Sequence, residues 1–233
     1  IPRANNLAGK HVTILHSGIP YPNEGLVELE LILQILKDAK AKRVEIFFTY
    51  FPYGMQDNAF LKGETNAAKM LVQKLIRYWC VEKISIIDAH FAGKKWAARY
   101  PLHFLSAVPL LLEAARRDWG KELLFLSPDK GGKRRTAIEN IHKKRENSYV
   151  VTMHASKAMQ KRIKGRTIAA VDDLVETGGT LERFYDECKR AGAKEAIALI
   201  THGVLPKGIS RVKNTYAKLY LCNTINRKEA NVD

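Results

Sequence analysis

The sequence predicts an α/β fold made of two domains, each with a parallel β-sheet. Short apolar segments, typical of buried strands, alternate with longer segments whose apolar residues recur at helical spacing. The alternation runs twice, because strand–helix units occur before and after about residue 103. Right-handed crossovers would place helices on both faces of each sheet, and ligands would bind at the carboxyl ends of the strands.

In the N-terminal half, the segment 24–38 shows the helical pattern most clearly. Leu29, Ile32 and Leu36 recur at helical spacing, and Asn23 and Gly25 are start signals. We expect strands at His11–Leu15, Val44–Tyr50 and Ile84–Ile87, and helices at Glu24–Asp38 and Thr65–Tyr78.

The C-terminal half repeats the alternation with more, and shorter, apolar segments. Their length favours strands and the segments between them favour helices. We expect helices at Ala107–Arg117, Arg134–Ile141 and Leu181–Arg190, and strands at Leu123–Leu126, Tyr149–Thr152, Thr167–Val171, Ala196–Ile200 and Leu219–Cys222.

The charge of the chain indicates anionic partners. Its 233 residues carry a formal net charge of +15, and 46% are hydrophobic, which is enough for a sizeable core. Basic clusters at Lys130–Arg135 and Lys143–Arg145 would suit nucleic acid. However, the chain shows no nucleic-acid-binding motif, and phosphorylated substrates also need positive charge. We therefore do not expect nucleic acid as the partner.

The chain carries no sign of a membrane or secretory segment. No run approaches ~20 consecutive apolar residues, and residues 1–6 lack the apolar region of a secretory signal. Cys80, Cys188 and Cys222 are odd in number and widely spaced, so they form neither a disulfide framework nor a Cys-x-x-Cys metal site. We expect reduced thiols in a cytoplasmic protein with no membrane partner.

The most informative segment is 171–180, Val-Asp-Asp-Leu-Val-Glu-Thr-Gly-Gly-Thr, which joins an expected strand to an expected helix. Gly178 and Gly179 let the backbone approach a phosphate closely. Free amides at the helix start attract an anion, and Thr177 and Thr180 add hydroxyl donors. Asp172 and Asp173 could accept hydrogen bonds from sugar hydroxyls or hold a divalent metal. The pattern predicts a phosphosugar site; a capped helix after a strand is the plainer alternative.

The same segment resembles the phosphoribosyl-pyrophosphate (PRPP) signature of the type I phosphoribosyltransferase fold. From Asn6 to Asn226, the chain further resembles the ribose-phosphate pyrophosphokinase (PRPP synthetase) family. Six ordered segments carry this resemblance: Phe51–Asp57, Ile87–His90, His103–Leu110, Ser127–Gly132, Ile141–Arg145 and Thr201–Val204. The Phe-Pro-Tyr and Ser-Pro-Asp runs within them resemble the synthetase and not salvage transferases.

This resemblance implies an activity and an organisation. ATP and ribose 5-phosphate would give PRPP and AMP, because the C1 hydroxyl of the sugar takes the diphosphoryl group from the β-phosphorus of ATP. Two phosphoribosyltransferase-like domains would span 1–103 and 104–233. The resemblance also implies a homo-oligomer, either a dimer or a hexamer, with shared ATP sites.

The resemblance implies roles for individual residues. Lys143 and Arg145 match the catalytic basic pair, which would stabilise charge on the transferring group. ATP would contact Gln56, Asp57 and His90, and Mg²⁺ would be held near His90 and Asp129. Ribose 5-phosphate would bind Asp172, Asp173, Glu176, Thr177, Gly178, Gly179 and Thr180.

Each role has a structural alternative. Lys143 and Arg145 could belong to a solvated basic loop, His90 could be a hydrogen-bonded structural residue, and Asp129 could form a turn. The family usually has Asp at the position of Glu176, a change that keeps the charge and adds one methylene.

Three departures from the family concern the nucleotide side. The family's Phe-Ser-Asp-Gly-Glu adenine loop is not found, so we expect a domain truncated at its start. Met55 stands where the family has an ATP-contacting Arg, and a thioether cannot replace a forked cation. His142 and Lys144 replace an Asp and an Arg beside the catalytic pair.

These departures leave three readings open. The first is an active, divergent PRPP synthetase. The second is a non-catalytic homologue that regulates active subunits, which the missing loop and Met55 favour but the basic pair disfavours. The third is a salvage phosphoribosyltransferase, for which the chain shows no base-recognition segment.

Overall fold

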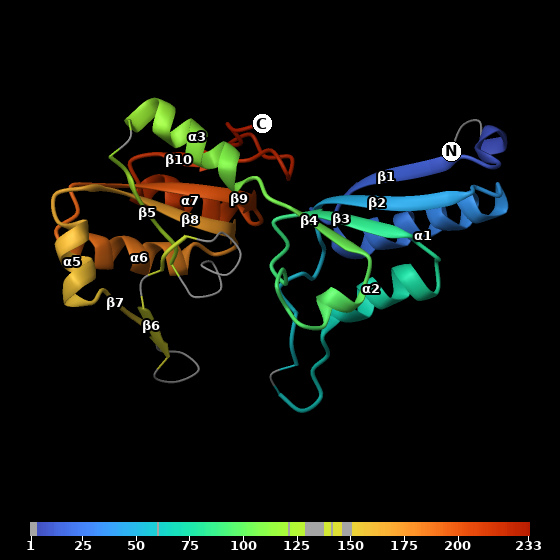
Figure 1. The fold of residues 1–233 in the computed structure, drawn as a ribbon, viewed down its shortest axis with the longest axis horizontal. Coiled ribbons are helices and arrows are strands. Elements are labelled where there is room, and N and C mark those ends of the chain that lie inside the picture. Colours follow the sequence, from blue (N-terminus) through green and yellow to red (C-terminus); the bar gives the residue numbers. More distant parts are fainter. Residues whose placement is uncertain (1–3, 60, 121, 129–137, 141, 146–150) are drawn as a thin grey trace. The chain divides into compact units, whose positions relative to one another are not determined.

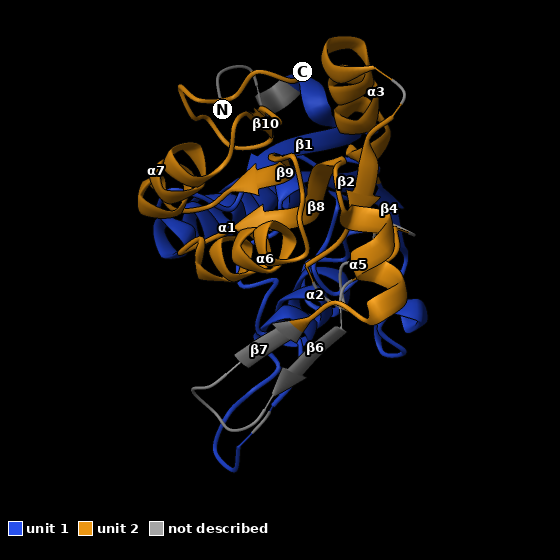
Figure 2. Cartoon of the chain, turned by 90° about the vertical axis from the view of Figure 1, so that its left-hand side faces the viewer, with its two compact units in different colours: residues 1–105 blue, residues 106–233 orange. Residues whose placement is uncertain are grey.

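The computed structural model describes residues 4–59, 61–120, 122–128, 138–140, 142–145 and 151–233. The chain divides into two compact units, Ile1–Leu105 and Ser106–Asp233, which Figure 2 colours separately. Each unit has its own parallel sheet and its own core, so the predicted α/β fold with two parallel sheets is confirmed.

The N-terminal unit is a four-stranded sheet in the order β1-β2-β3-β4, with all neighbouring strands parallel. Figure 1 shows α1 and α2 on one face of this sheet, where Leu29 and Leu71 share a core with Ile46. The elements are a 3-10 turn η1 (Ala4–Leu7), β1 (His11–Ser17), α1 (Pro22–Asp38), β2 (Arg43–Tyr50), α2 (Ala67–Arg77), β3 (Lys83–Ile87), η2 (Ala97–Arg99) and β4 (Leu102–Leu105).

Local sequence signals mark the N-termini of both helices of this unit. Pro22 opens α1, since its fixed φ suits the first turn and its missing N–H would have no helical partner there. Asn66 caps α2, because its side chain accepts a hydrogen bond from the Lys69 amide at 2.8 Å. Both starts lie on connections that leave the carboxyl edge of the sheet.

The C-terminal unit is a four-stranded parallel sheet in the order β10-β9-β8-β5, covered on both faces. Helix α3 packs on β9 and β10, whereas α5, α6 and α7 share the main core on the other face (Figure 1). The elements are α3 (Val108–Trp119), β5 (Leu124–Leu126), β6 (His142–Arg145), β7 (Val151–His154), α5 (Lys157–Ile163), β8 (Thr167–Val175), α6 (Gly179–Arg190), β9 (Glu195–Gly203), α7 (Pro206–Thr215) and β10 (Leu219–Leu221).

Two strands extend further than their apolar runs predict. β8 continues to Val175 and β9 to Gly203, because the ladder between them persists and pairs Asp172 with Ile200 and Leu174 with His202. Asp172 and Asp173 therefore lie within the last part of β8. Backbone pairing sets the strand end here, and the apolar pattern does not reveal it.

The expected helix at 134–141 is not borne out where it can be checked. Of that segment, only residues 138–140 are described, and they are not helical. Asn140 instead forms a bridge with Ser127, and the strand β6 follows. β6 pairs with β7 as an antiparallel hairpin that the sequence pattern did not indicate.

No helix in the described part of the chain is long and apolar enough to cross a lipid bilayer. The three cysteines differ in exposure: Cys80 is exposed, whereas Cys188 and Cys222 are buried, and none is in a disulfide.

Thiol reactivity should follow this difference. Burial in α6, with a smaller contribution from the neighbouring Glu187 carboxylate, raises the pKa of the Cys188 thiol to about 12. At pH 8 the native chain should therefore show one fast thiol with Ellman's reagent, and Cys80→Ser should abolish it. The denatured chain should show three. A fast second thiol in native Cys80→Ser would contradict the packing around Cys188 and Cys222.

Candidate active site

The loop that the sequence predicts to bind phosphate, here called the phosphate loop, joins β8 to α6 in the C-terminal unit. The loop runs from Glu176 to Gly178, and α6 begins at Gly179. Gly178 has φ of +79°, a left-handed conformation that side chains rarely adopt. The first amides of α6 point out of the helix start, and the helix dipole favours an anion there. The loop therefore combines a left-handed glycine with a free helix start, and phosphate binding there stays a prediction.

Helix α7 supports this loop from behind. A Cβ atom on Gly208 would lie 2.2 Å from the Glu176 carbonyl oxygen, so only glycine permits this approach. The Val204 amide also donates to the Val175 carbonyl at 2.9 Å. The Tyr216 hydroxyl donates to the Leu181 carbonyl at 2.7 Å, and burial raises the pKa of this phenol well above its usual value. α7 and the residues just before and after it thus contact the end of β8, the loop and the first turn of α6.

Two arginines, Arg183 and Arg211, border the loop. Neither of them was identified from the sequence as a site residue. A Cβ atom on Gly179 would lie 3.6 Å from Arg211 Nη1, 3.8 Å from Arg183 Nη1 and 3.9 Å from Thr177 Oγ1. Arg211 also pairs with Glu182 at 3.7 Å. Spacing could have found Arg183, since it lies four residues after Gly179 on the same helix face. Arg211 could not be placed, because the sequence pattern did not predict α7.

The carboxylates of β8 lie beside the loop and are both buried. Asp173 is 1% exposed, and its amide donates to Asp172 Oδ1 at 3.1 Å. Both residues take part in further interactions of the folded chain. A buried carboxylate is tolerated only when polar or charged groups interact with it, so neither residue is isolated in the core.

A buried histidine ends β9, next to the carboxylate strand. His202 Nδ1 lies 2.8 Å from Thr224 Oγ1, and that hydroxyl donates to the Thr201 carbonyl at 2.7 Å. Because the threonine has a single proton to donate, it must accept from His202 Nδ1–H. The ring is therefore held with its proton on Nδ1.

The basic pair lies on the β6–β7 hairpin. Lys143 pairs with Met153 and Arg145 with Val151 in the antiparallel ladder. The two positions are separated by one residue on a strand, so they fall on the same face of β6. Asp129, the expected metal-associated residue, lies outside the described residues.

The residues that the resemblance predicts to contact ATP lie in the N-terminal unit, on connections that follow β2 and β3. Gln56 is exposed and His90 is half-buried after β3. Asp57 is buried and its carboxylate pairs with Lys94 at 3.1 Å, while its carbonyl accepts from Trp96 Nε1 at 3.3 Å. These contacts indicate a structural task for Asp57. Met55, at 37% exposure, presents its thioether at the surface of the same connection.

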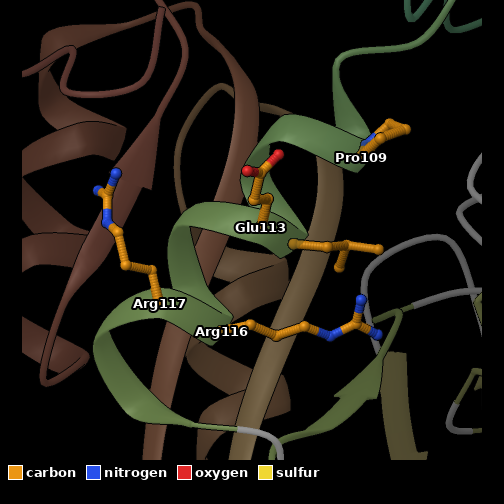
Figure 3. A pocket seen from close by; sticks show the side chains of 5 residues that line it. Pro109, Glu113, Arg116 and Arg117 are labelled. Carbon is orange, nitrogen blue, oxygen red and sulfur yellow. The ribbon is translucent and has the colours of Figure 1, made fainter.

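Among the described residues, no group of three or more His, Cys, Asp or Glu side chains is placed to hold a metal ion. A surface hollow of about 580 Å³ lies instead on α3 and is large enough for a ligand. A single helix lines it, and Figure 3 shows Arg116 and Arg117 extending in opposite directions. Arg116 lies over the Phe125 ring, 5.1 Å from its centre. No phosphate cradle forms there, so we do not assign a substrate to this hollow.

Comparison with known proteins decides the family. Residues 2–78 match the N-terminal domain of ribose phosphate pyrophosphokinase, and residues 136–233 match the phosphoribosyl transferase domain. Ribose-phosphate pyrophosphokinase 1 of Streptococcus pneumoniae serotype 4 is 31% identical over 94% of this chain and 72% of its own length. The chain belongs to the ribose-phosphate pyrophosphokinase family.

A second relative agrees with this family, and a solved structure shares the fold. The ribose-phosphate pyrophosphokinase of Ralstonia nicotianae is 30% identical over 87% of this chain and 66% of its own length, so the chain spans about two thirds of that relative. The crystal structure of phosphoribosylpyrophosphate synthetase from Mycobacterium smegmatis has the same fold, with a TM-score of 0.79 at 22% identity. The match covers 97% of this chain and 77% of that one. The family resemblance predicted from the sequence is thereby confirmed.

Proposed function

We propose that this chain transfers the diphosphoryl group of ATP to the C1 hydroxyl of ribose 5-phosphate and so forms PRPP and AMP. The observation that carries the proposal is the segment 176–180, which is the loop and the first two residues of α6, in a chain of this family. Its left-handed Gly178, the start of α6 and the supporting Gly208 form a backbone cradle for a sugar phosphate.

The sugar-phosphate half of the reaction would be bound by the C-terminal unit. Glu176, Thr177, Gly178, Gly179 and Thr180 would surround the 5-phosphate, with Arg183 and Arg211 adding positive potential at Gly179. Asp172 and Asp173 would accept hydrogen bonds from the ribose hydroxyls. Because Gly178 and Gly208 fix the backbone of the loop, little backbone freedom would be lost when the sugar binds.

The nucleotide half would use Gln56 and His90. His90 is half-buried on the connection that follows β3, so its ring remains within reach of a ligand at the carboxyl edge of the sheet. Asp57 fits a supporting role better than direct ATP contact, because Lys94 already holds its carboxylate.

Mg²⁺ fits the donor set that His90 and Asp129 would provide. This ion typically takes only one or two carboxylates from a protein and completes its coordination with phosphate oxygens and water, so a sparse protein set is adequate. When bound, Mg²⁺ would neutralise charge on the phosphate oxygens of ATP. His90 and Asp129 would hold and orient it beside the nucleotide.

Lys143 and Arg145 would act on the transferring group. The sugar C1 oxygen forms a bond to the β-phosphorus of ATP, and the bond between that phosphorus and the oxygen of the α-phosphate breaks, which releases AMP. Negative charge on the phosphate oxygens would be met by the two cations of one β6 face. We also expect a homo-oligomer, dimer or hexamer, as the family resemblance implies.

The exposed Met55 supports a second candidate, a non-catalytic homologue that assembles with active subunits. In the absence of a guanidinium at this position, ATP affinity would fall while the sugar-phosphate site stays intact. The two candidates therefore differ in nucleotide turnover and agree in sugar binding.

One assay separates the two candidates. The purified chain is given ATP, Mg²⁺ and ribose 5-phosphate, and AMP and PRPP are measured together. Equal amounts of both products, absent when ribose replaces ribose 5-phosphate, would support the synthetase. No AMP, together with thermal protection by ribose 5-phosphate but not by ribose, would support the regulatory homologue. If the chain shows neither AMP formation nor thermal protection by ribose 5-phosphate, both candidates are contradicted.

A further inference from the structure

A buried carboxylate on α6 links the phosphate-loop helix to the hairpin that carries the basic pair. Glu187 is 3% exposed. Its Oε1 accepts a hydrogen bond from the Ala155 amide at 2.7 Å, and its Oε2 lies 2.6 Å from Arg190 Nη1. Ala155 directly follows β7, so the buried end of this carboxylate holds the exit of the hairpin.

The chemistry of Glu187 is unusual for a core position. Its neighbours Phe184 and Cys188 are fully buried, and burying a carboxylate among such groups is unfavourable unless it is paired and hydrogen-bonded. An apolar side chain of similar size would fill the space without that penalty. Compared with such a side chain, the carboxylate adds a charge-assisted hydrogen bond to a backbone amide and an ion pair with Arg190, whose side chain is 63% exposed.

Both ends of the hairpin are fixed to the body of the C-terminal unit. At the exit, the Ala155 carbonyl also accepts from Gln160 Nε2 of α5 at 3.0 Å. At the entry, the Ser127 amide donates to the Glu139 carbonyl at 2.8 Å, and the Glu139 carboxylate pairs with Arg162 at 2.6 Å. Of these contacts, the Glu187 hydrogen bond is the one that reaches α6.

We propose that Glu187 is a positioning residue that fixes the β6–β7 hairpin, and with it Lys143 and Arg145, to the helix that begins at the phosphate loop. This inference rests on the proposed function for its effect on the reaction. Met153, the partner of Lys143 in the ladder, lies two residues before Ala155. A shift of Ala155 would therefore also shift Met153 and, through the ladder, Lys143. A displacement of about 1 Å at a reacting group can lower a rate by roughly 100-fold.

The test compares three variants of the whole chain. Glu187→Met removes the acceptor with little change of volume. Glu187→Gln keeps an amide oxygen for the Ala155 N–H and removes the charge, so it should restore much of what Glu187→Met loses. Ile168→Val, in the same core at the start of β8, is the control for a general loss of stability.

Two measurements are made on each variant: hydrogen exchange at the Ala155 amide, and kcat and KM for ribose 5-phosphate. In Glu187→Met we expect hydrogen exchange at the Ala155 amide to be at least about 10-fold faster, and kcat to fall to about one tenth of the wild-type value or lower. KM for ribose 5-phosphate should stay within about twofold of wild type, because the phosphate loop is unchanged. Unchanged exchange, or an equal loss of kcat in Ile168→Val, would overturn the proposal. If the wild-type chain forms no AMP, the proposed function fails, and the exchange result alone decides whether Glu187 holds the hairpin.

Discussion

Replacing Gly208 with alanine should remove most of the affinity of the chain for ribose 5-phosphate. The new Cβ would lie 2.2 Å from the Glu176 carbonyl oxygen and 2.8 Å from its carbonyl carbon, and both are backbone atoms that no rotamer change can move. Either α7 or the phosphate loop must shift. Overpacking of this kind destabilises by about 1–3 kcal/mol. We expect KM for ribose 5-phosphate to rise about 10-fold or more, measured with ATP saturating.

The matched control is Gly25→Ala in α1. There the nearest atom to a new Cβ is His16 Nε2 at 3.5 Å, an ordinary contact, and alanine favours a helix by up to about 1 kcal/mol over glycine. Gly25→Ala should leave KM unchanged and hold or raise the melting temperature. Wild-type KM in a folded Gly208→Ala variant would show that α7 does not set the loop geometry.

Replacing Lys143 with alanine should lower the rate of AMP formation by about 100- to 1,000-fold. The expected reason is loss of a fixed cation beside phosphate oxygens that gain charge during transfer. KM for ribose 5-phosphate and its thermal protection should stay near wild type, because in the proposed function α6 and its loop bind the sugar phosphate. Lys143→Arg should recover only part of the rate, since the two cations differ in shape and donor geometry.

Lys144→Ala is the natural comparison, as it removes the same charge from the next residue of β6. Successive positions of a strand lie on opposite faces, so this variant should lose less than about threefold in rate. Equal losses in the two variants would mean that net charge on the hairpin matters, and not the face that Lys143 shares with Arg145.

The parts of the fold that the sequence predicted well are those with a strong apolar period. α1 and α6 were expected almost at their observed bounds, since their buried residues recur at helical spacing. α7, β6 and the pairing of β6 with β7 escaped prediction, whereas the expected strand at Tyr149–Thr152 overlaps β7. α7 is rich in Lys, Arg, Asn and Ser, and β6 reads His-Lys-Lys-Arg, a composition that resembles a solvated loop.

The candidate site also contains some residues that the sequence predicted and others that it did not. The 171–180 segment could be read directly, because strand, carboxylates, glycines and helix follow one another without interruption. Gly208, Arg211 and Glu187 could not, because each acts on a segment that is distant in the chain. A glycine needed for close approach looks like any other glycine until its neighbour is known. Asp57 shows the reverse case, since its place in a family motif did not indicate that Lys94 would engage it.

The contact between Gly208 and the Glu176 carbonyl has a consequence for redesign. Anyone who wishes to retune this loop for a different phosphorylated sugar must vary two segments together, 176–180 and 206–211, because a larger residue at 208 is tolerated only if Glu176 moves away. A library that varies only residues 176–180 would include loop conformations that clash with α7. Two libraries of the 176–180 segment could be compared, one with Gly208 kept and one with position 208 also varied. The comparison would separate loop variants that fail because they clash with α7 from variants that fail because they do not bind the sugar.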